Sequence, residues 1–216
     1  MFIGHFGLGF GAKTLAPKTS LGTLLMAAQF IDLLWPVFLL LGLERVHIAP
    51  GATRVTPLRF EHYPFSHSLL AVCGWAVLLG GVHFYRRRDR RSAVVIGALV
   101  VSHWFLDAVV HQPDLPLLPG SHLLVGLGVW SSLPLTLLIE VPLFLCGVWL
   151  YIRRSVASDA VGKWGLAALI VVLLVIYAGN LFGGPPPNAQ AIAWAGQLQW
   201  LFVLCGYWVD KHRRRP

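Results

Sequence analysis

The chain has 216 residues, of which 56% are hydrophobic and only 12% are charged, and its formal net charge is +8. A soluble domain usually has roughly 25% charged residues, and a globule of this size cannot bury so much apolar surface. A disordered chain would be poor in apolar residues. The composition therefore predicts one all-α, polytopic membrane domain over residues 1–216, with the lipid bilayer as its partner.

The apolar segments predict a short N-terminal half-helix followed by six membrane spans. Residues 1–20 are glycine-rich, and the segment is too interrupted to supply the roughly 20 apolar residues that a crossing needs. The spans are expected near residues 21–43, 67–85, 92–111, 133–152, 164–182 and 192–209. The last two form a helical hairpin, because the proline-rich segment Gly183–Asn188 cannot continue a helix.

Basic residues set the expected orientation of the spans. All lysines and arginines except Arg45, Arg54 and Arg59 lie on one side of the predicted membrane. Because basic loops are retained in the cytoplasm, we expect that side to be cytoplasmic and to include the C-terminus. The extracytoplasmic loops are then 44–66, 112–132 and 183–191. Basic clusters between long apolar runs also argue against a nucleic-acid partner.

Several ionisable residues lie inside the predicted spans, where charge is costly and is usually functional. At a rise of 1.5 Å per residue, Asp32 and His103 lie roughly 16 Å above the inner ends of their spans. Asp107 lies higher, and His111 and His67 lie near the outer surface. These residues predict a polar column that leads from mid-membrane to a cavity open to the extracytoplasmic side.

The pattern His103-x3-Asp107-x3-His111 is typical of a metal-binding helix face. Steps of four residues place these side chains on one slowly drifting stripe. A single ion would use His103 with Asp107, or Asp107 with His111, whereas two ions could share Asp107. The remaining ligands are expected among residues of other segments, namely Asp32, His67, His5 and His62. Imidazole and carboxylate groups suit a divalent ion such as zinc or manganese better than calcium.

Each of these residues also has a structural interpretation. A histidine or aspartate in a membrane helix is often a packing or hydrogen-bonding residue, and on spacing alone His5 is structural. Glu61 and His62 are ordinary solvated residues unless their loop folds over the cavity. Glu140 can pair with a histidine or hold a proton, and Ser66 is expected to be the N-cap of the second span.

At these positions the sequence resembles the bacterial family of predicted membrane-bound metal-dependent hydrolases. The family pattern has an N-terminal histidine, an aspartate in the first long helix, a Thr/Ser-His-Ser motif and a later Ser-His-x3-Asp motif. The matching residues here are His5, Asp32, Ser66-His67-Ser68 and Ser102-His103-x3-Asp107. The resemblance covers residues 1–130. It departs from the pattern at Phe30, where many members have a second aspartate, and at Tyr63, where many have an arginine.

The residues and the resemblance together favour a metal-dependent hydrolase of the bacterial inner membrane. The expected ligands of a zinc-like ion are His67, His103 and Asp107, completed or supported by Asp32 or His5. The ion would acidify a water molecule. Glu61, or a carboxylate such as Asp32 that is not used as a ligand, would act as general base. The depth of the site favours a lipid-like or membrane-proximal ester, amide or phosphoester as substrate.

Two other functions use the same residues. A proton- or cation-coupled transporter would relay ions through Asp32, Glu140 and the histidines, but the sequence has no inverted repeat and no paired broken helices. A non-catalytic scaffold would use these residues to hold the helices together. Interhelical polar contacts average only about 0.6 kcal/mol, which makes so many ionisable groups excessive for that purpose.

Overall fold

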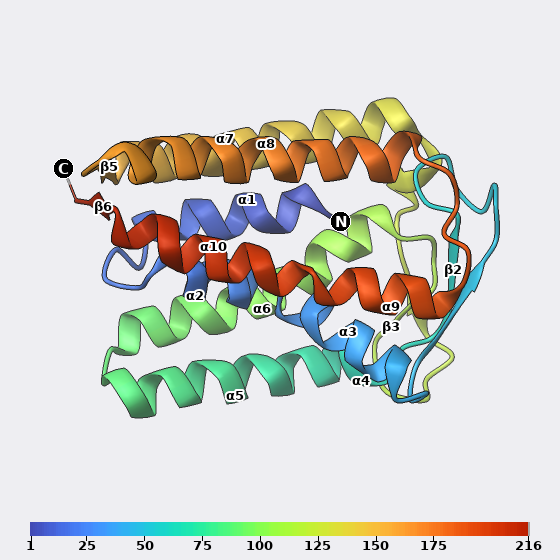
Figure 1. Ribbon diagram of the computed structural model, residues 1–216. Coiled ribbons are helices and arrows are strands. Elements are labelled where there is room, and N and C mark those ends of the chain that lie inside the picture. The colour runs from blue at the N-terminus through green and yellow to red at the C-terminus, as the bar shows by residue number, and fades with distance from the viewer. Residues whose placement is uncertain (216) are drawn as a thin grey trace.

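The computed structural model describes residues 1–215 and is a bundle of α-helices that carries three small antiparallel sheets (Figure 1). The helices are α1 (Ile3–Gly11), α2 (Leu21–Ala28), α3 (Phe30–Leu40), α4 (Pro64–His67), α5 (Leu69–Arg87), α6 (Arg90–Val110), α7 (Leu133–Arg153), α8 (Ala160–Phe182), α9 (Ala189–Gln197) and α10 (Gln199–Lys211). The strand pairs are β1 (Arg45–Ile48) with β2 (Leu58–His62), β3 (Leu115–Pro116) with β4 (Leu124–Val125), and β5 (Val156–Ala157) with β6 (Arg213–Arg214). This mostly helical architecture agrees with the all-α prediction.

Among the described residues, four helices are long and apolar enough to cross a membrane, namely α5, α6, α7 and α8. The predicted first span is instead two helices, α2 and α3, which meet at Gln29 with a bend of 58° and would make a fifth span if they cross together. The predicted sixth span is also divided, because α9 ends at Gln197 and α10 begins at Gln199. Six continuous spans are therefore not confirmed, and the structure supports four or five.

Side-chain caps define where several helices begin. The carboxylate of Asp89 accepts a hydrogen bond from the Ser92 backbone N–H at 3.1 Å, which starts α6. Asp159 does the same for α8, and Asn188 does so for α9. Capping side chains satisfy backbone donors that have no partner in the first turn. Ser66, expected as the cap of the second span, is replaced in that role by Ser68, whose side chain accepts from the Ala71 N–H at the start of α5.

The outer faces of the long helices are apolar and exposed. Val77 on α5, Leu138 on α7 and Val175 on α8 are among the many large hydrophobic side chains that face away from the bundle. Contiguous apolar surface on this scale is rare on soluble monomers. The exposed faces are therefore consistent with a membrane protein.

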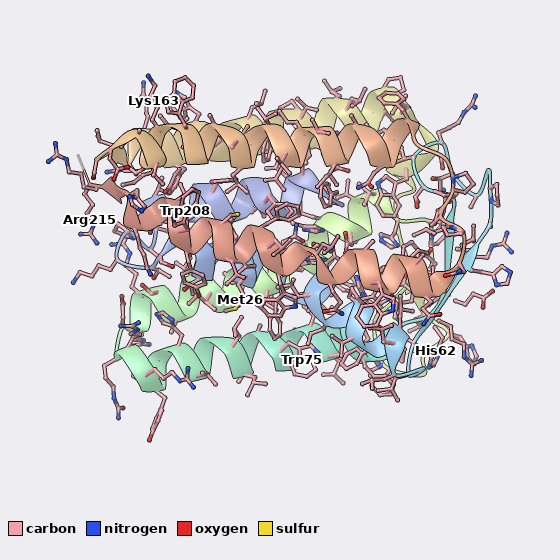
Figure 2. All side chains as sticks on the ribbon, viewed as in Figure 1. Met26, His62, Trp75, Lys163, Trp208 and Arg215 are labelled. Atoms are coloured by element: carbon pink, nitrogen blue, oxygen red, sulfur yellow. The ribbon has the colours of Figure 1, made fainter. Side chains whose placement is uncertain are left out.

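The two ends of the bundle differ in composition. Lys163 and Arg215 lie at the end where α7 turns into α8 and where α10 finishes, whereas His62 lies at the opposite end, next to the β1–β2 hairpin (Figure 2). At the basic end, Asp210 joins three segments. Its carboxylate accepts from Lys13 Nζ at 2.7 Å and from the Tyr151 hydroxyl at 2.8 Å. This network ties the loop before α2 and the helix α7 to α10.

Helix α1 runs through the interior of the bundle, packed against α7, α2 and α6 (Figure 1). Its closest approach to α7 depends on two glycines. A Cβ atom at Gly147 would collide with the carbonyl oxygen of Gly7, and a Cβ atom at Gly7 would lie 2.7 Å from the Leu143 carbonyl oxygen. Small residues at helix crossings let the backbones approach closely. This contact sets the position of His5, which α1 carries.

We predict that Gly147→Leu moves α1 and exposes His5. The new side chain meets backbone atoms that cannot rotate away, so α1 itself must shift. Modification of His5 by diethylpyrocarbonate, mapped by mass spectrometry, should rise from near zero in the wild type to a clear signal in the variant. Gly81→Leu is the control, because nothing lies within 4 Å of a Cβ atom at Gly81. Equal protection of His5 in both variants would contradict the packing role of Gly147.

Candidate metal centre

Side chains from four helices converge in the interior of the bundle. His5 comes from α1, Asp32 from α3, His67 from α4, and His103 and Asp107 from α6. Their ligand atoms form two overlapping groups, each with all atoms within 4.8 Å of one another. One group is His5, His103 and Asp107, and the other is Asp32, His67 and His103. The sequence analysis named all five residues, and the structure brings them into one buried cluster that could bind a metal ion.

The hydrogen bond of His103 fixes which of its nitrogens faces the cluster. His103 Nδ1 lies 2.8 Å from the carbonyl oxygen of Ala28, and a carbonyl can only accept, so Nδ1 carries the proton. The bend after α2 leaves this carbonyl available. In the neutral ring, Nε2 then has a free lone pair. That atom is buried and has no hydrogen-bond partner among residues 1–215.

His67 is oriented by a chain of two further side chains. Ser66 Oγ donates to Glu44 Oε2 at 2.6 Å and lies 2.7 Å from His67 Nδ1. Because the single hydroxyl proton of Ser66 goes to the carboxylate, His67 Nδ1 is the donor to Ser66 and its Nε2 is left with a lone pair. Glu44 Oε1 also accepts from the backbone N–H groups of Phe65 and Ser66 at 2.9 and 2.8 Å. Outer partners of this kind commonly orient metal-binding histidines.

Four acceptor atoms lie at separations that are close to those between the ligands of one metal ion. His103 Nε2 lies 3.2 Å from Asp107 Oδ2 and 3.5 Å from Asp32 Oδ1. His67 Nε2 lies 3.6 Å from the same Asp32 oxygen and 3.7 Å from the same Asp107 oxygen. In a tetrahedral site with bonds of about 2.1 Å, ligand atoms are about 3.4 Å apart. The separations therefore fit one divalent ion.

The charges of this arrangement also call for a cation. Asp32 and Asp107 bring two carboxylates into an interior that is otherwise largely apolar, and the facing imidazole nitrogens carry lone pairs in the neutral rings. Acceptors cannot satisfy one another, and buried charge without a partner is strongly unfavourable. The Met1 amino group pairs with Asp107, so the second carboxylate still calls for a bound metal ion or a proton on an imidazole.

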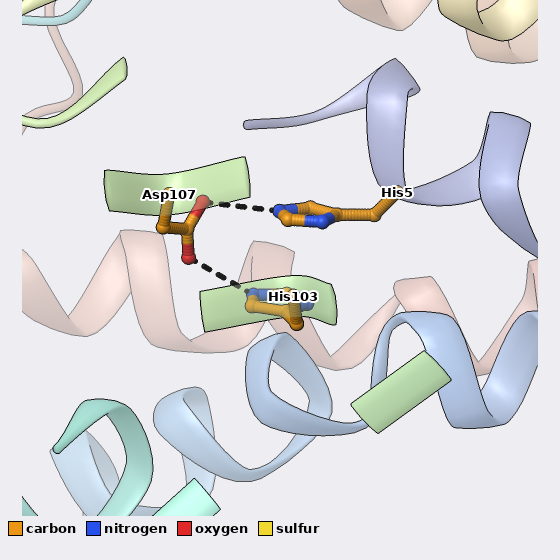
Figure 3. Close-up of side chains that lie close together, drawn as sticks. All are labelled: His5, His103 and Asp107. Atoms are coloured by element: carbon orange, nitrogen blue, oxygen red, sulfur yellow. Dashed lines mark hydrogen bonds and ion pairs between the residues drawn. The ribbon is translucent and has the colours of Figure 1, made fainter. Parts of the chain in front are cut away.

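His5 approaches the second oxygen of the Asp107 carboxylate. Its Nε2 lies 3.1 Å from Asp107 Oδ1, and the Met1 nitrogen donates to the same oxygen at 2.5 Å. Figure 3 shows the rings of His5 and His103 side by side, one directed at each carboxylate oxygen, and their centroids are 3.6 Å apart in a stacked arrangement. Asp107 is thus held from both sides, by α1 and by its own helix.

Three residues named from the sequence, Glu61, His62 and His111, lie outside this cluster. Glu61 and His62 are exposed on β2, and Glu61 Oε1 has His47 Nδ1 at 3.9 Å. His62 stands opposite Arg45 in the hairpin register. The loop 44–66 does fold over one end of the bundle, but it directs these two side chains to the surface. Neither residue lines the cavity next to the cluster.

His111 is buried near the cluster but does not join either group of ligand atoms. Its ring is 6.5 Å from that of His67, and its Nδ1 lies 3.0 Å from Asp114 Oδ1. The Tyr63 hydroxyl donates to the same Asp114 oxygen at 2.8 Å. Burial, together with the negative charge of Asp114, raises the pKa of Tyr63, so this hydroxyl stays protonated and remains a donor. His111 is thus part of the wall above the cluster.

A cavity of about 660 Å³ opens beside the cluster. Asp32, His67, Asp107 and His111 line it, and so does Glu140 from α7. Glu140 is buried, and its Oε2 accepts from the Phe2 backbone N–H at 3.0 Å. The sequence singled out Glu140 for its place in a span but gave no sign that it shares a cavity with Asp32. Glu44 and the role of Ser66 were missed, because a carboxylate in a loop ordinarily indicates a solvated residue.

We predict that Ser66→Ala weakens metal binding without unfolding the protein. Loss of the hydroxyl frees His67 to rotate, and removal of such an outer partner typically lowers metal affinity by about 10–100-fold. The affinity can be measured by competition with a chromophoric zinc chelator in detergent. Ser102→Ala is the matched control, because Ser102 is adjacent to His103 but bonds only the Leu99 carbonyl of its own helix. Equal affinities in the two variants would show that Ser66 does not position His67.

No family model, curated protein or solved structure matches the chain. The function must therefore be inferred from the geometry of the cluster and the cavity.

Proposed function

We propose that the protein is a membrane-embedded metal-dependent hydrolase. The observation that carries this proposal is the convergence of three acceptor atoms, His67 Nε2, His103 Nε2 and Asp107 Oδ2, with Asp32 Oδ1 beside both histidines. The lone pair of each histidine is directed inward by a hydrogen bond on its other nitrogen. Zinc is the ion that best suits two imidazoles and one carboxylate with a fourth position left for water, and manganese is the alternative.

A divalent ion held by these residues would lower the pKa of a water molecule to about 7. Asp32 is the group best placed to receive the released proton. Its side chain is 22% exposed, whereas those of Asp107, His67 and His103 are 2%, 4% and 0% exposed. Asp32 also lines the cavity, so water and substrate reach the cluster on its side. Glu61, the other candidate base, lies on the surface strand β2 and does not line the cavity.

The reaction is hydrolysis of an ester, amide or phosphoester. For an ester, the water oxygen bonds to the acyl carbon while the bond from that carbon to the leaving oxygen breaks. Asp32 takes a proton from the water and passes it to the leaving oxygen, so that a carboxylic acid and an alcohol are formed. The buried His5 supports Asp107 through the second carboxylate oxygen and does not itself reach the cavity.

The arrangement of the bundle supports a location in the bacterial inner membrane. The segments rich in basic residues, including the C-terminus, gather at one end (Figure 2). With that end in the cytoplasm, the β1–β2 hairpin lies on the extracytoplasmic side and the cavity lies below it. The resemblance of residues 1–130 to predicted membrane-bound hydrolases is in line with this assignment.

We predict about one equivalent of zinc per chain in the purified wild type, measured by inductively coupled plasma mass spectrometry. The double variant His103→Ala/Asp107→Ala should carry none. Asp32→Asn should keep the ion, because three ligands remain, but should hydrolyse ester probes about 100-fold more slowly because it lacks the base. His122→Ala is the control and should behave as the wild type, since it lies in the outer loop after α6 and outside both groups of ligand atoms.

Three results would count against the proposal. Absence of stoichiometric metal from both the wild type and the double variant would favour protonated histidines that merely hold the helices together. A metal-loaded wild type whose turnover is unaffected by Asp32→Asn would exclude Asp32 as the base. A metal- or pH-dependent flux in liposomes that is lost in Asp32→Asn, with no hydrolysis, would instead favour a transporter.

A further inference from the structure

The cavity next to the cluster extends between two helices that separate toward one end of the bundle. Helix α8 packs against α10, whereas α9, which precedes α10, packs against α3. Figure 1 shows α8 and α9 diverging toward the loop that joins them. Residues of both helices line the cavity, among them Ile176 and Gly179 from α8 and Ile192 and Ala195 from α9. We call this part of the cavity the α8–α9 slot.

The slot is apolar and is continuous with the cluster. Ile176, Leu181, Ile192 and Phe202 line the same cavity as Asp32 and His67. A cavity of about 660 Å³ with mostly apolar walls and a few convergent polar groups is typical of a small-molecule site. An occupant must therefore combine an apolar part with a polar, reactive part.

Apolar side chains frame the slot on the outside of the bundle. Val175 and Phe182 on α8, and Trp194 and Leu198 at α9, are all exposed. Helix α8 is long and apolar enough to span a membrane, and on such a helix exposed apolar side chains would face acyl chains. The surroundings of the slot thus match the hydrocarbon part of a bilayer.

Two polar groups in the cavity wall have no partner within the protein. The Tyr177 hydroxyl and the Gln199 side-chain oxygen are buried, and neither has a hydrogen-bond partner among residues 1–215. Both residues line the cavity. Buried polar groups are nearly always paired in native structures. A ligand with both acceptor and donor groups close to its apolar part would satisfy them.

We propose that the α8–α9 slot takes the acyl chain of a bilayer lipid and that the substrate of the hydrolase is such a lipid. The chain lies between α8 and α9, and the ester group next to it reaches Asp32 and the metal ligands. This inference rests on the proposed function for the reaction, and on the slot for the class of substrate.

Gly179 allows the slot to be blocked without disturbing the packing of the helices. It lines the cavity, and a Cβ atom placed there meets nothing within 4 Å. Gly179→Trp should therefore fill the slot with an indole ring. Gly81→Trp is the matched control, because Gly81 is an exposed helical glycine with the same open surroundings on α5 and does not line the cavity.

The experiment uses the full chain in liposomes of phosphatidylethanolamine and phosphatidylglycerol that contain a phosphatidylglycerol with a diazirine in one acyl chain. After irradiation, mass spectrometry maps the cross-linked residues. We expect the wild type and Gly81→Trp to show cross-links at Ile176, Ile192 and Phe202. We expect Gly179→Trp to lose them while keeping the cross-links at Val77, which is exposed on the outer face of α5.

Cross-links confined to exposed residues such as Val77, or cavity cross-links that persist in Gly179→Trp, would overturn the proposal. The readout does not require turnover, and the experiment is repeated after removal of metal with a chelator. Retained cavity cross-links in a protein that proves to have no hydrolase activity would show a lipid site without the proposed reaction. Hydrolysis of a short water-soluble ester by a protein without cavity cross-links would support the proposed reaction but exclude the lipid site.

Discussion

Two carboxylates and two imidazole nitrogens face one another in the interior of the bundle, and the rest of the site is arranged around this contact. Asp32 and Asp107 each lie within 3.7 Å of both His67 Nε2 and His103 Nε2. Such a set is stable in an apolar interior only when a positive charge sits among its members. The hydrogen bonds to Ala28 and Ser66 commit both histidines to this geometry, because each ring already donates from its other nitrogen.

Irregular features of the fold place Asp32 and bring His5 to this set. The break between α2 and α3 places Asp32 and leaves the Ala28 carbonyl available to His103. The glycine contact between α1 and α7 lets a helix too short to cross a membrane run through the core, where it carries His5 to Asp107. Non-helical backbone at membrane depth is tolerated where it is buried in protein or lines a cavity. Both conditions are met here, which is why the irregular segments and the cluster coincide.

Much of the cluster could be predicted from the sequence, because ionisable residues inside apolar helices are rare and the spacing of His103 and Asp107 places them on one helix face. The break at Gln29 could not, since neither proline nor glycine marks it, and Gly196 alone was too weak a signal for the break at Leu198 that divides the predicted sixth span. The links from Glu44 to His67 depend on how a loop folds back over the helices. Local spacing does not encode that path.

The central claim is that these side chains bind one divalent ion through both histidines and at least one carboxylate. X-ray absorption at the zinc K-edge, on the zinc-loaded protein in detergent, tests it most directly. The account predicts a first shell of nitrogen and oxygen at about 2.0–2.2 Å, with outer-shell scattering from two imidazole rings that is lost in His67→Ala/His103→Ala. A shell of oxygen alone, or an imidazole signal unchanged in that variant, would contradict it.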